Sequence, residues 1–153
     1  MFIKEVIRAL ETQGVRYVLV GGCAVALHGA VRGTVDIDLV VPLTKVAFQR
    51  TESALGGLGL ASRLPVTAAE VFAFRNEYVR NRNLTTWTFV NPDKPLEIVD
   101  IIITVDARRV KTATKRAFGM ELRIMAIPDL IAMKKASGRA QDIEDIKALE
   151  KLA

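Results

Sequence analysis

The sequence has one cysteine and one histidine in 153 residues, so neither a disulfide framework nor a zinc site is expected. No apolar run approaches the length of a membrane span. The opening MFIKEVIRALETQG carries a glutamate and a periodic apolar face in place of the apolar segment of a signal peptide, which favours a cytoplasmic protein without a membrane partner. Internal repeats and low-complexity linkers are also missing, and we expect one domain over residues 1–153.

The composition is that of a globular protein with a basic balance. Half of the residues are hydrophobic (50%), enough for a core, and the formal net charge is +5. The sequence pI of about 9.6 is compatible with a polyanionic partner.

The most informative stretch is Tyr17 to Val41, YVLVGGCAVALHGAVRGTVDIDLVV. Its apolar beginning, Tyr17 to Val20, predicts a buried strand that ends at Gly21-Gly22, and Cys23 to His28 continue as a small-residue helix. A strand that passes through glycines into a helix presents free backbone N–H groups, which suit a phosphate.

The following strand, Val35 to Val41, carries two acids. Side chains two residues apart share one face of a strand, so Asp36 and Asp38 point the same way while Ile37 and Leu39 face the core. Carboxylates in an apolar strand are costly unless a positive group meets them, and Mg²⁺ is held by such oxygen ligands together with substrate phosphates. The alternative is a solvated sheet edge with surface acids.

These residues carry a family resemblance. Gly21-Gly22 followed by Asp36-Ile37-Asp38 resembles the signature of the DNA polymerase β-like nucleotidyltransferase superfamily. The longer string looks most like the small bacterial minimal nucleotidyltransferases and the abortive-infection toxin-like branch of toxin–antitoxin systems. Many members have Gly-Ser where this chain has Gly21-Gly22, and Gly22 offers only its N–H group.

The resemblance implies a fold and a reaction. The fold is α/β (α+β), a small mixed twisted sheet with helices mainly on one face, followed by a C-terminal helical pair. The reaction moves a nucleoside monophosphate from an NTP, such as ATP, to an acceptor hydroxyl, with two Mg²⁺ ions, or Mn²⁺, as cofactors. A tRNA end, a partner protein and a small molecule are the acceptors that relatives use.

A third acid lies in the strongly β-forming run Leu96 to Val105. Apolar neighbours require Asp100 to face either a cation or an arginine such as Arg32 or Arg139. By resemblance, Asp100 is the third carboxylate of the metal site and the proton acceptor, and Asp106 is a weaker substitute.

Positive residues follow in two places. The segment Asp106 to Phe118 carries Arg108, Arg109, Lys111, Lys115 and Arg116, which suit a triphosphate or a nucleic-acid acceptor, or else form a solvated helix or loop face. By resemblance, Lys134 contacts phosphate or nucleotide, and Arg139 and Asp142 shape the nucleotide side of the cleft. From the residues alone, Lys134 is equally an exposed helix residue and Asp142 a surface acid that complements a helix dipole.

The remaining elements are read from periodicity and capping residues. We expect helices over Phe2 to Thr12, from Thr44 to about Leu55, from Thr67 to Phe74, and from Pro128 to Gly138. Strands are expected over Leu84 to Val90 and Met120 to Ile127, with a turn over Asn91 to Pro95. A closing helix has Ile143, Ile146, Leu149 and Leu152 as its apolar stripe.

Several single residues have a structural and a functional interpretation. His28 and Cys23 are favoured as structural, while Arg32 and Thr34 are candidates for phosphate or carboxylate contacts. Trp87 is assigned to sheet packing, with base stacking as the alternative. For the whole chain, the alternative to an enzyme is an inactive nucleotidyltransferase fold that serves as an antitoxin or as a partner- or nucleic-acid-binding module.

Overall fold

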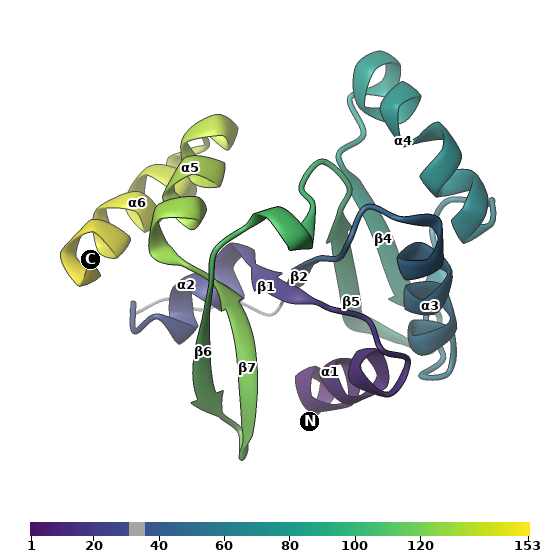
Figure 1. Cartoon of the computed structure of the whole chain (residues 1–153), viewed down its shortest axis with the longest axis horizontal. Helices are drawn as coiled ribbons and strands as arrows, with labels where there is room; N and C mark the ends of the chain where they lie inside the picture. Colours follow the sequence, from purple (N-terminus) through teal and green to yellow (C-terminus); the bar gives the residue numbers. More distant parts are fainter. Residues whose placement is uncertain (31–35) are drawn as a thin grey trace.

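The computed structural model describes residues 1–30 and 36–153, so the predicted contacts of Arg32 and Thr34 lie outside the described residues. Figure 1 shows the arrangement of the chain. The helices are α1 (Phe2–Thr12), α2 (Gly21–Leu27), α3 (Lys45–Gly56), α4 (Ala68–Arg82), α5 (Ile127–Ser137) and α6 (Ala140–Leu152), with a short 3₁₀ helix η1 (Ala107–Arg109). The strands are β1 (Val18–Val20), β2 (Ile37–Val40), β3 (Ala61–Ser62), β4 (Thr86–Asn91), β5 (Lys94–Ile102), β6 (Thr112–Ala117) and β7 (Met120–Met125).

The strands form one seven-stranded sheet in the order β3-β4-β5-β2-β1-β7-β6. The central strand β2 pairs antiparallel with β1 and parallel with β5, and β1 pairs parallel with β7. Both outer pairs, β4–β5 and β6–β7, are antiparallel. The mixed sheet predicted from the family resemblance is confirmed.

The helices lie in two groups on either side of the central strands (Figure 1). In one group α1 packs on α3 and α3 on α4; in the other α5 packs on α6, and α6 also contacts α2. The predicted C-terminal helical pair is therefore present. No helix in the described part of the chain is both long and apolar enough to cross a membrane.

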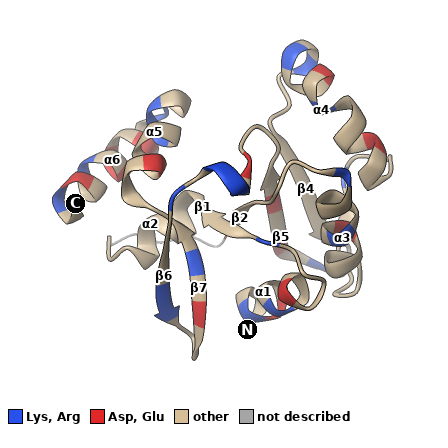
Figure 2. Cartoon of the chain, in the orientation of Figure 1, with Lys and Arg blue, Asp and Glu red and all other residues tan. Residues whose placement is uncertain are grey.

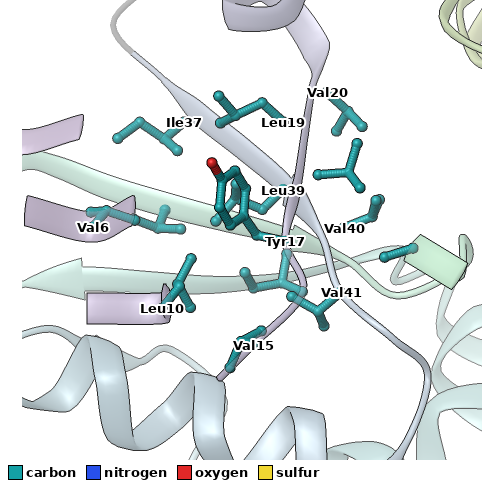
Figure 3. Close-up of a cluster of buried hydrophobic side chains, with 14 of the residues drawn as sticks. Val6, Leu10, Val15, Tyr17, Leu19, Val20, Ile37, Leu39, Val40 and Val41 are labelled. Carbon is teal, nitrogen blue, oxygen red and sulfur yellow. The ribbon is translucent and has the colours of Figure 1, made fainter. Parts of the chain in front are cut away.

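The core lies where α1 covers the central strands. Figure 3 shows Val6 and Leu10 of α1 against Leu19, Leu39 and neighbouring apolar residues. All four of these side chains are fully buried. The alternation in β2 is as predicted, since Ile37 and Leu39 are buried and Asp38, between them, is only partly covered. This packing fixes the face on which Asp38 lies.

Two elements differ from the sequence-based expectation. The helix from Thr67, which a Thr67–Glu70 capping box starts as expected, was predicted to end at Phe74. It continues to Arg82, because the first residue with left-handed backbone is Asn83. The basic segment, for which a solvated helix or loop face was the alternative to a ligand-binding role, is the short helix η1 followed by strand β6, which β7 holds in an antiparallel ladder.

Smaller corrections concern strand ends and helix stripes. Strand β5 begins at Lys94, inside the predicted turn, and β2 begins at Ile37, so that Asp36 precedes it. On α6, Leu149 is buried, but Ile143 and Leu152 are exposed, because α6 contacts the fold along only part of the predicted stripe.

Candidate functional site

A glycine corner joins β1 to α2 and lies directly against an acid of β2. Val20 is opposite Asp38 in the antiparallel ladder, and the chain enters α2 at Gly21 with a φ of +65°. A Cβ atom at Gly21 would collide with the Asp38 carboxylate. Position 21 therefore requires glycine for two reasons: its backbone is left-handed, and the Asp38 carboxylate occupies the space that a side chain would need.

The acids of β2 and β5 are neighbours. Asp38 and Asp100 are opposite each other in the parallel β2–β5 pair, which places their side chains on the same face of the sheet. The Thr88 hydroxyl donates a 2.7 Å hydrogen bond to Oδ1 of Asp100. Asp36 is exposed just before β2. Arg139, the alternative partner considered for Asp100, instead pairs with Asp142 at 2.9 Å.

The electrostatic surroundings of Asp38 disfavour its negative charge. Burial, followed by the negative charges of Asp100 and Asp36, raises the pKa of Asp38 to about 6. Lys134 and Arg139 act in the opposite direction and are outweighed. Among the described residues, none makes an ion pair with this carboxylate. The site thus holds partly desolvated negative charge that lacks a full counter-charge.

A cavity of about 450 Å³ opens beside this corner. It brings together predicted site residues from both ends of the chain, namely Gly21, Asp38, Lys134, Arg139 and Asp142. The β4–β5 wall of the cavity is formed by Thr86 of β4, Ile102 of β5 and the flanking residues Thr85 and Thr104. Gly22, Asp36 and Asp100 lie outside the cavity lining.

The helical pair forms a buried charge cluster at the cavity. Lys134 is 6% exposed, and its Nζ lies 3.1 Å from Oδ1 of Asp142 and 3.0 Å from Oδ2 of Asp145. Burial opposes ionisation of Asp142, but hydrogen bonds from Arg139, Ser137 and Lys134 hold its pKa well below its usual range. Lys134 and Asp142 are therefore not the exposed surface residues of the alternative interpretation.

Sequence reasoning missed Asp145 and the threonine wall. Asp145 is 3% exposed. Its carboxylate accepts a hydrogen bond from the Gln141 side chain and forms an ion pair with Lys134. The signal available was the spacing of Asp142 and Asp145, which places both carboxylates on the same side of a helix. No comparable signal marks threonines as cavity residues.

The donor set suits a hard divalent cation in its chemistry. Asp38 and Asp100 offer adjacent carboxylate oxygens with uncompensated charge, and Mg²⁺ is usually held by one or two carboxylates plus phosphate oxygens. Within residues 1–30 and 36–153, no three acidic, His or Cys side chains are grouped closely enough to hold a metal by themselves. The residues fit an ion whose coordination is completed by substrate.

Other conspicuous residues have structural surroundings. His28 shares a 2.8 Å hydrogen bond with the Met125 carbonyl, and burial raises the pKa of the Cys23 thiol to about 11, far from a reactive thiolate. Trp87 is fully buried, stacks on Phe48 and donates to the Ser62 hydroxyl, as sheet packing predicts. Asp106 is held by Arg108 at 2.7 Å.

The overall fold matches solved structures. The lincosamide antibiotic adenylyltransferase LnuA, in its lincomycin-bound crystal structure, superposes with a TM-score of 0.66 at 12% identity, over 99% of this chain and 96% of that one. The solution structure of the antibiotic-resistance factor ANT(2'')-Ia gives 0.64 at 13% identity, over 97% and 80%. This chain has a nucleotidyltransferase fold.

An antigenic nucleotidyltransferase-like protein from Paracoccidioides brasiliensis shares this nucleotidyltransferase fold, with a TM-score of 0.62 at 16% identity, over 99% of this chain and 76% of that one. No family model matches the sequence, and no curated protein does. The family resemblance read from the glycine and aspartate motifs is thus confirmed at the level of the fold. At these identities, the chemistry has to be argued from the site.

Proposed function

We propose that this protein is a metal-dependent nucleotidyltransferase that moves a nucleoside monophosphate from an NTP to an acceptor hydroxyl. The observation that carries the proposal is the meeting of Gly21, Asp38 and the Lys134–Arg139 side of the helical pair around one cavity, with Asp100 in register beside Asp38. This arrangement supplies acidic oxygens on one side of the cavity and the N–H donors of Lys134 and Arg139 on the other. LnuA and ANT(2'')-Ia, which share the fold, are an adenylyltransferase and an antibiotic-resistance factor by name.

In the proposed reaction, the acceptor oxygen attacks the α-phosphorus of the NTP. The bond from this phosphorus to the bridging oxygen breaks, pyrophosphate leaves with the bonding electrons, and the hydroxyl proton passes to a base. We assign the base to Asp100. Its Oδ1 accepts from Thr88, which holds the carboxylate in place and leaves Oδ2 for the proton.

We assign the metal positions to Asp38 and Asp100, whose paired carboxylates suit Mg²⁺ together with substrate phosphates, and to Asp36, which directly precedes β2 and would join the set once the substrate is bound. Bound Mg²⁺ would neutralise charge on the triphosphate and on the departing pyrophosphate. Asp38 is central in this assignment. The negative charges of Asp100 and Asp36 both raise its pKa, and its side chain also lines the cavity.

The phosphate side of the cavity is assigned to the glycine corner and the helical pair. Gly21 and Gly22 offer backbone N–H groups at the start of α2. A lysine ammonium has three N–H donors, and Asp142 and Asp145 engage two of those on Lys134, leaving one for a phosphate oxygen. Arg139 has a 74% exposed side chain although Asp142 anchors it, and we place it at the nucleotide.

For the biological setting we propose a toxin–antitoxin-type system in the cytoplasm. The support is the resemblance of the stretch from Gly21 to Val41 to the toxin-like branch. Induced expression of the wild-type chain would then arrest bacterial growth, while Asp38→Asn would not. Equal growth of the two strains at equal protein levels would contradict this setting.

The enzymatic proposal is tested by pyrophosphate release from each of the four NTPs with Mg²⁺ and a pool of cellular RNA and protein acceptors. We expect release with at least one NTP and a loss of at least 100-fold with Asp38→Asn, since removal of one transition-state charge contact typically costs 10²–10³ in rate. The matched control is Asp93→Asn, an exposed acid in the β4–β5 turn. Equal rates for both variants would refute the assignment.

A further inference from the structure

The β6–β7 hairpin extends away from the helices and ends the sheet (Figure 1). Because β6 is the last strand in the sheet order, one of its edges pairs with no strand among the described residues. This strand is the basic segment that the sequence singled out, and none of its residues lines the cavity. Its charges therefore need an explanation outside the nucleotide site.

Positive side chains gather along this edge. Figure 2 marks lysine and arginine positions in blue on the ribbon of β6 and on the short helix η1 before it. Within the described residues, no carboxylate lies within 4.0 Å of the charged groups of Arg109, Lys111, Lys115 or Arg116, although Glu121 is opposite Arg116 in the ladder. Arg108, in contrast, is neutralised by Asp106 at 2.7 Å. The other four cations form the basic strip, which has no close ion pair in the described part of the chain. On β6, Arg116 shares one face with Thr112 and Thr114, and Lys115 lies on the opposite face.

The hairpin tip carries an aromatic residue in an unfavourable backbone conformation. Phe118 and Gly119 form a two-residue turn, with φ of +55° and +75°. Hairpin turns of this kind favour Asn-Gly, and a bulky residue with positive φ is an outlier. The Phe118 ring gains little from packing in return, since it is 44% exposed. Such a strained, exposed aromatic points to a binding role.

The strip leads from the tip to the cavity. The Lys111 N–H donates a 2.7 Å hydrogen bond to Asp129 in the first turn of α5, and Ala126 donates to the Lys111 carbonyl. Helix α5 then contributes Leu130, Met133 and Lys134 to the cavity wall. At a rise of about 3.3 Å per residue, Phe118 lies roughly 20 Å along the strand from this junction.

We infer that the β6 edge and Phe118 form a binding surface for a single-stranded nucleic acid, which is the acceptor of the proposed transfer reaction. Arg116 and Lys115, from the two faces of the β6 edge, contact phosphates, a base stacks on Phe118, and the nucleic acid runs along β6 so that its terminal hydroxyl reaches the cavity. The inference rests on the proposed function for the acceptor role, but the binding itself does not depend on turnover.

The chemistry of the strip favours a nucleic acid over other partners. A polycationic acceptor such as an aminoglycoside would be repelled by the edge and would find only threonines and Ile102 on the β4–β5 wall of the cavity. An acidic protein surface would not need a lone exposed aromatic. Phosphates, sugar hydroxyls and a base together match the lysines, arginines, threonines and phenylalanine.

The test measures binding of fluorescein-labelled 20-nucleotide RNA and DNA strands by anisotropy over a series of salt concentrations. For single strands, log K falls with log salt by about 0.7 per phosphate contact. The variant Lys115→Ala/Arg116→Ala should reduce this slope by about 1.4 and weaken binding at least fivefold. The charge-matched control Lys45→Ala/Arg50→Ala on α3 removes the same charge elsewhere and should leave both quantities unchanged.

A second variant separates binding from folding. Phe118→Asn installs the residue that the turn favours, so it should fold at least as stably as the wild type and still bind at least fivefold more weakly, because the stacking platform is lost. Unchanged affinity in both the charge variant and Phe118→Asn would overturn the inference. So would equal binding of poly-glutamate or of phosphatidylserine vesicles, in which case the strip is a general anion or membrane surface.

Oligonucleotide binding and pyrophosphate release are separate readouts of the β6 surface and of the catalytic site. Asp38→Asn should bind the oligonucleotides like the wild type and release no pyrophosphate. Binding without turnover in the wild type itself would leave the surface in place and refute the transferase. Turnover with a strip variant at the wild-type rate and KM would refute the acceptor role of the strip. A preference for RNA or DNA shows which strand is the ligand.

Discussion

Replacement of Asp38 by asparagine is expected to stabilise the protein while it abolishes transfer. In the folded chain the pKa of Asp38 rises from 3.8 to about 6, because of burial and of the charges of Asp100 and Asp36. The ionised side chain is therefore less stable in the folded than in the unfolded state. With 1.36 kcal/mol for each pKa unit, the cost at neutral pH is about 3 kcal/mol.

The sign of the effect fixes its pH dependence. Well above pH 6 the carboxylate is ionised in both states and the full cost applies, whereas the cost shrinks as the pH falls through 6 and disappears only well below 3.8, where the carboxyl is protonated in both states. We expect Asp38→Asn to raise the free energy of unfolding by about 1–3 kcal/mol at pH 7.5, less than the full cost because the amide also needs hydrogen-bond partners. At pH 4 the electrostatic part of the difference should fall to about 0.5 kcal/mol.

The assay is urea unfolding followed by fluorescence of Trp87, the one tryptophan, which is fully buried. Measurements in EDTA at pH 4, 6 and 7.5 give the pH dependence, and Asp93→Asn controls for the change in net charge. A loss of stability with Asp38→Asn at pH 7.5, or a gain that is equal at pH 4 and pH 7.5, would refute the electrostatic reasoning.

Further predictions concern the metal, the glycine corner, the buried ion pairs and the hairpin. Mg²⁺ at 100 times its Kd should raise the unfolding free energy of the wild type by about 2.7 kcal/mol, with no gain for the Asp38 variant, by the same urea assay. Gly21→Ala should cost at least about 1 kcal/mol and at least 10-fold in pyrophosphate release, because the new methyl group displaces the neighbouring carboxylate; wild-type values for both would contradict this. Asp145→Asn removes one of two buried partners of Lys134 and should cost about 3 kcal/mol, against less than about 0.5 for exposed Glu144→Gln; similar losses in the two variants would show that the buried pair is not special. Phe118→Asn should raise stability by about 1 kcal/mol in thermal unfolding, and a loss would show that the aromatic ring serves packing.

The parts of the site that the sequence predicted are those with local signals. Gly21-Gly22 and the Ile37-Asp38-Leu39 alternation report backbone geometry within a few residues, and both appear as predicted. The register that sets Asp100 beside Asp38 joins strands distant in sequence, and it was expected only from the family resemblance. Periodicity within one strand carries no information about which strand lies next to it.

The features that the sequence did not predict depend on tertiary contacts. The Lys134 side chain is buried because α6 places Asp142 and Asp145 against it, whereas its own helix gives no sign of burial. Likewise, the basic segment is a strand because β7 pairs with it, although its lysines and arginines have no strong preference for β structure.

The edge of β6 that pairs with no described strand also bears on how copies of this protein behave at high concentration. An unpaired strand edge offers its backbone groups to any other strand, and lysine or arginine on the edge is a common way to prevent such association. Arg116 and Lys115 would then oppose pairing between the β6 edges of two copies as well as contact a ligand. Oligomeric state should therefore be checked by sedimentation when these charges are removed, since self-association of the chains would compete for the same edge.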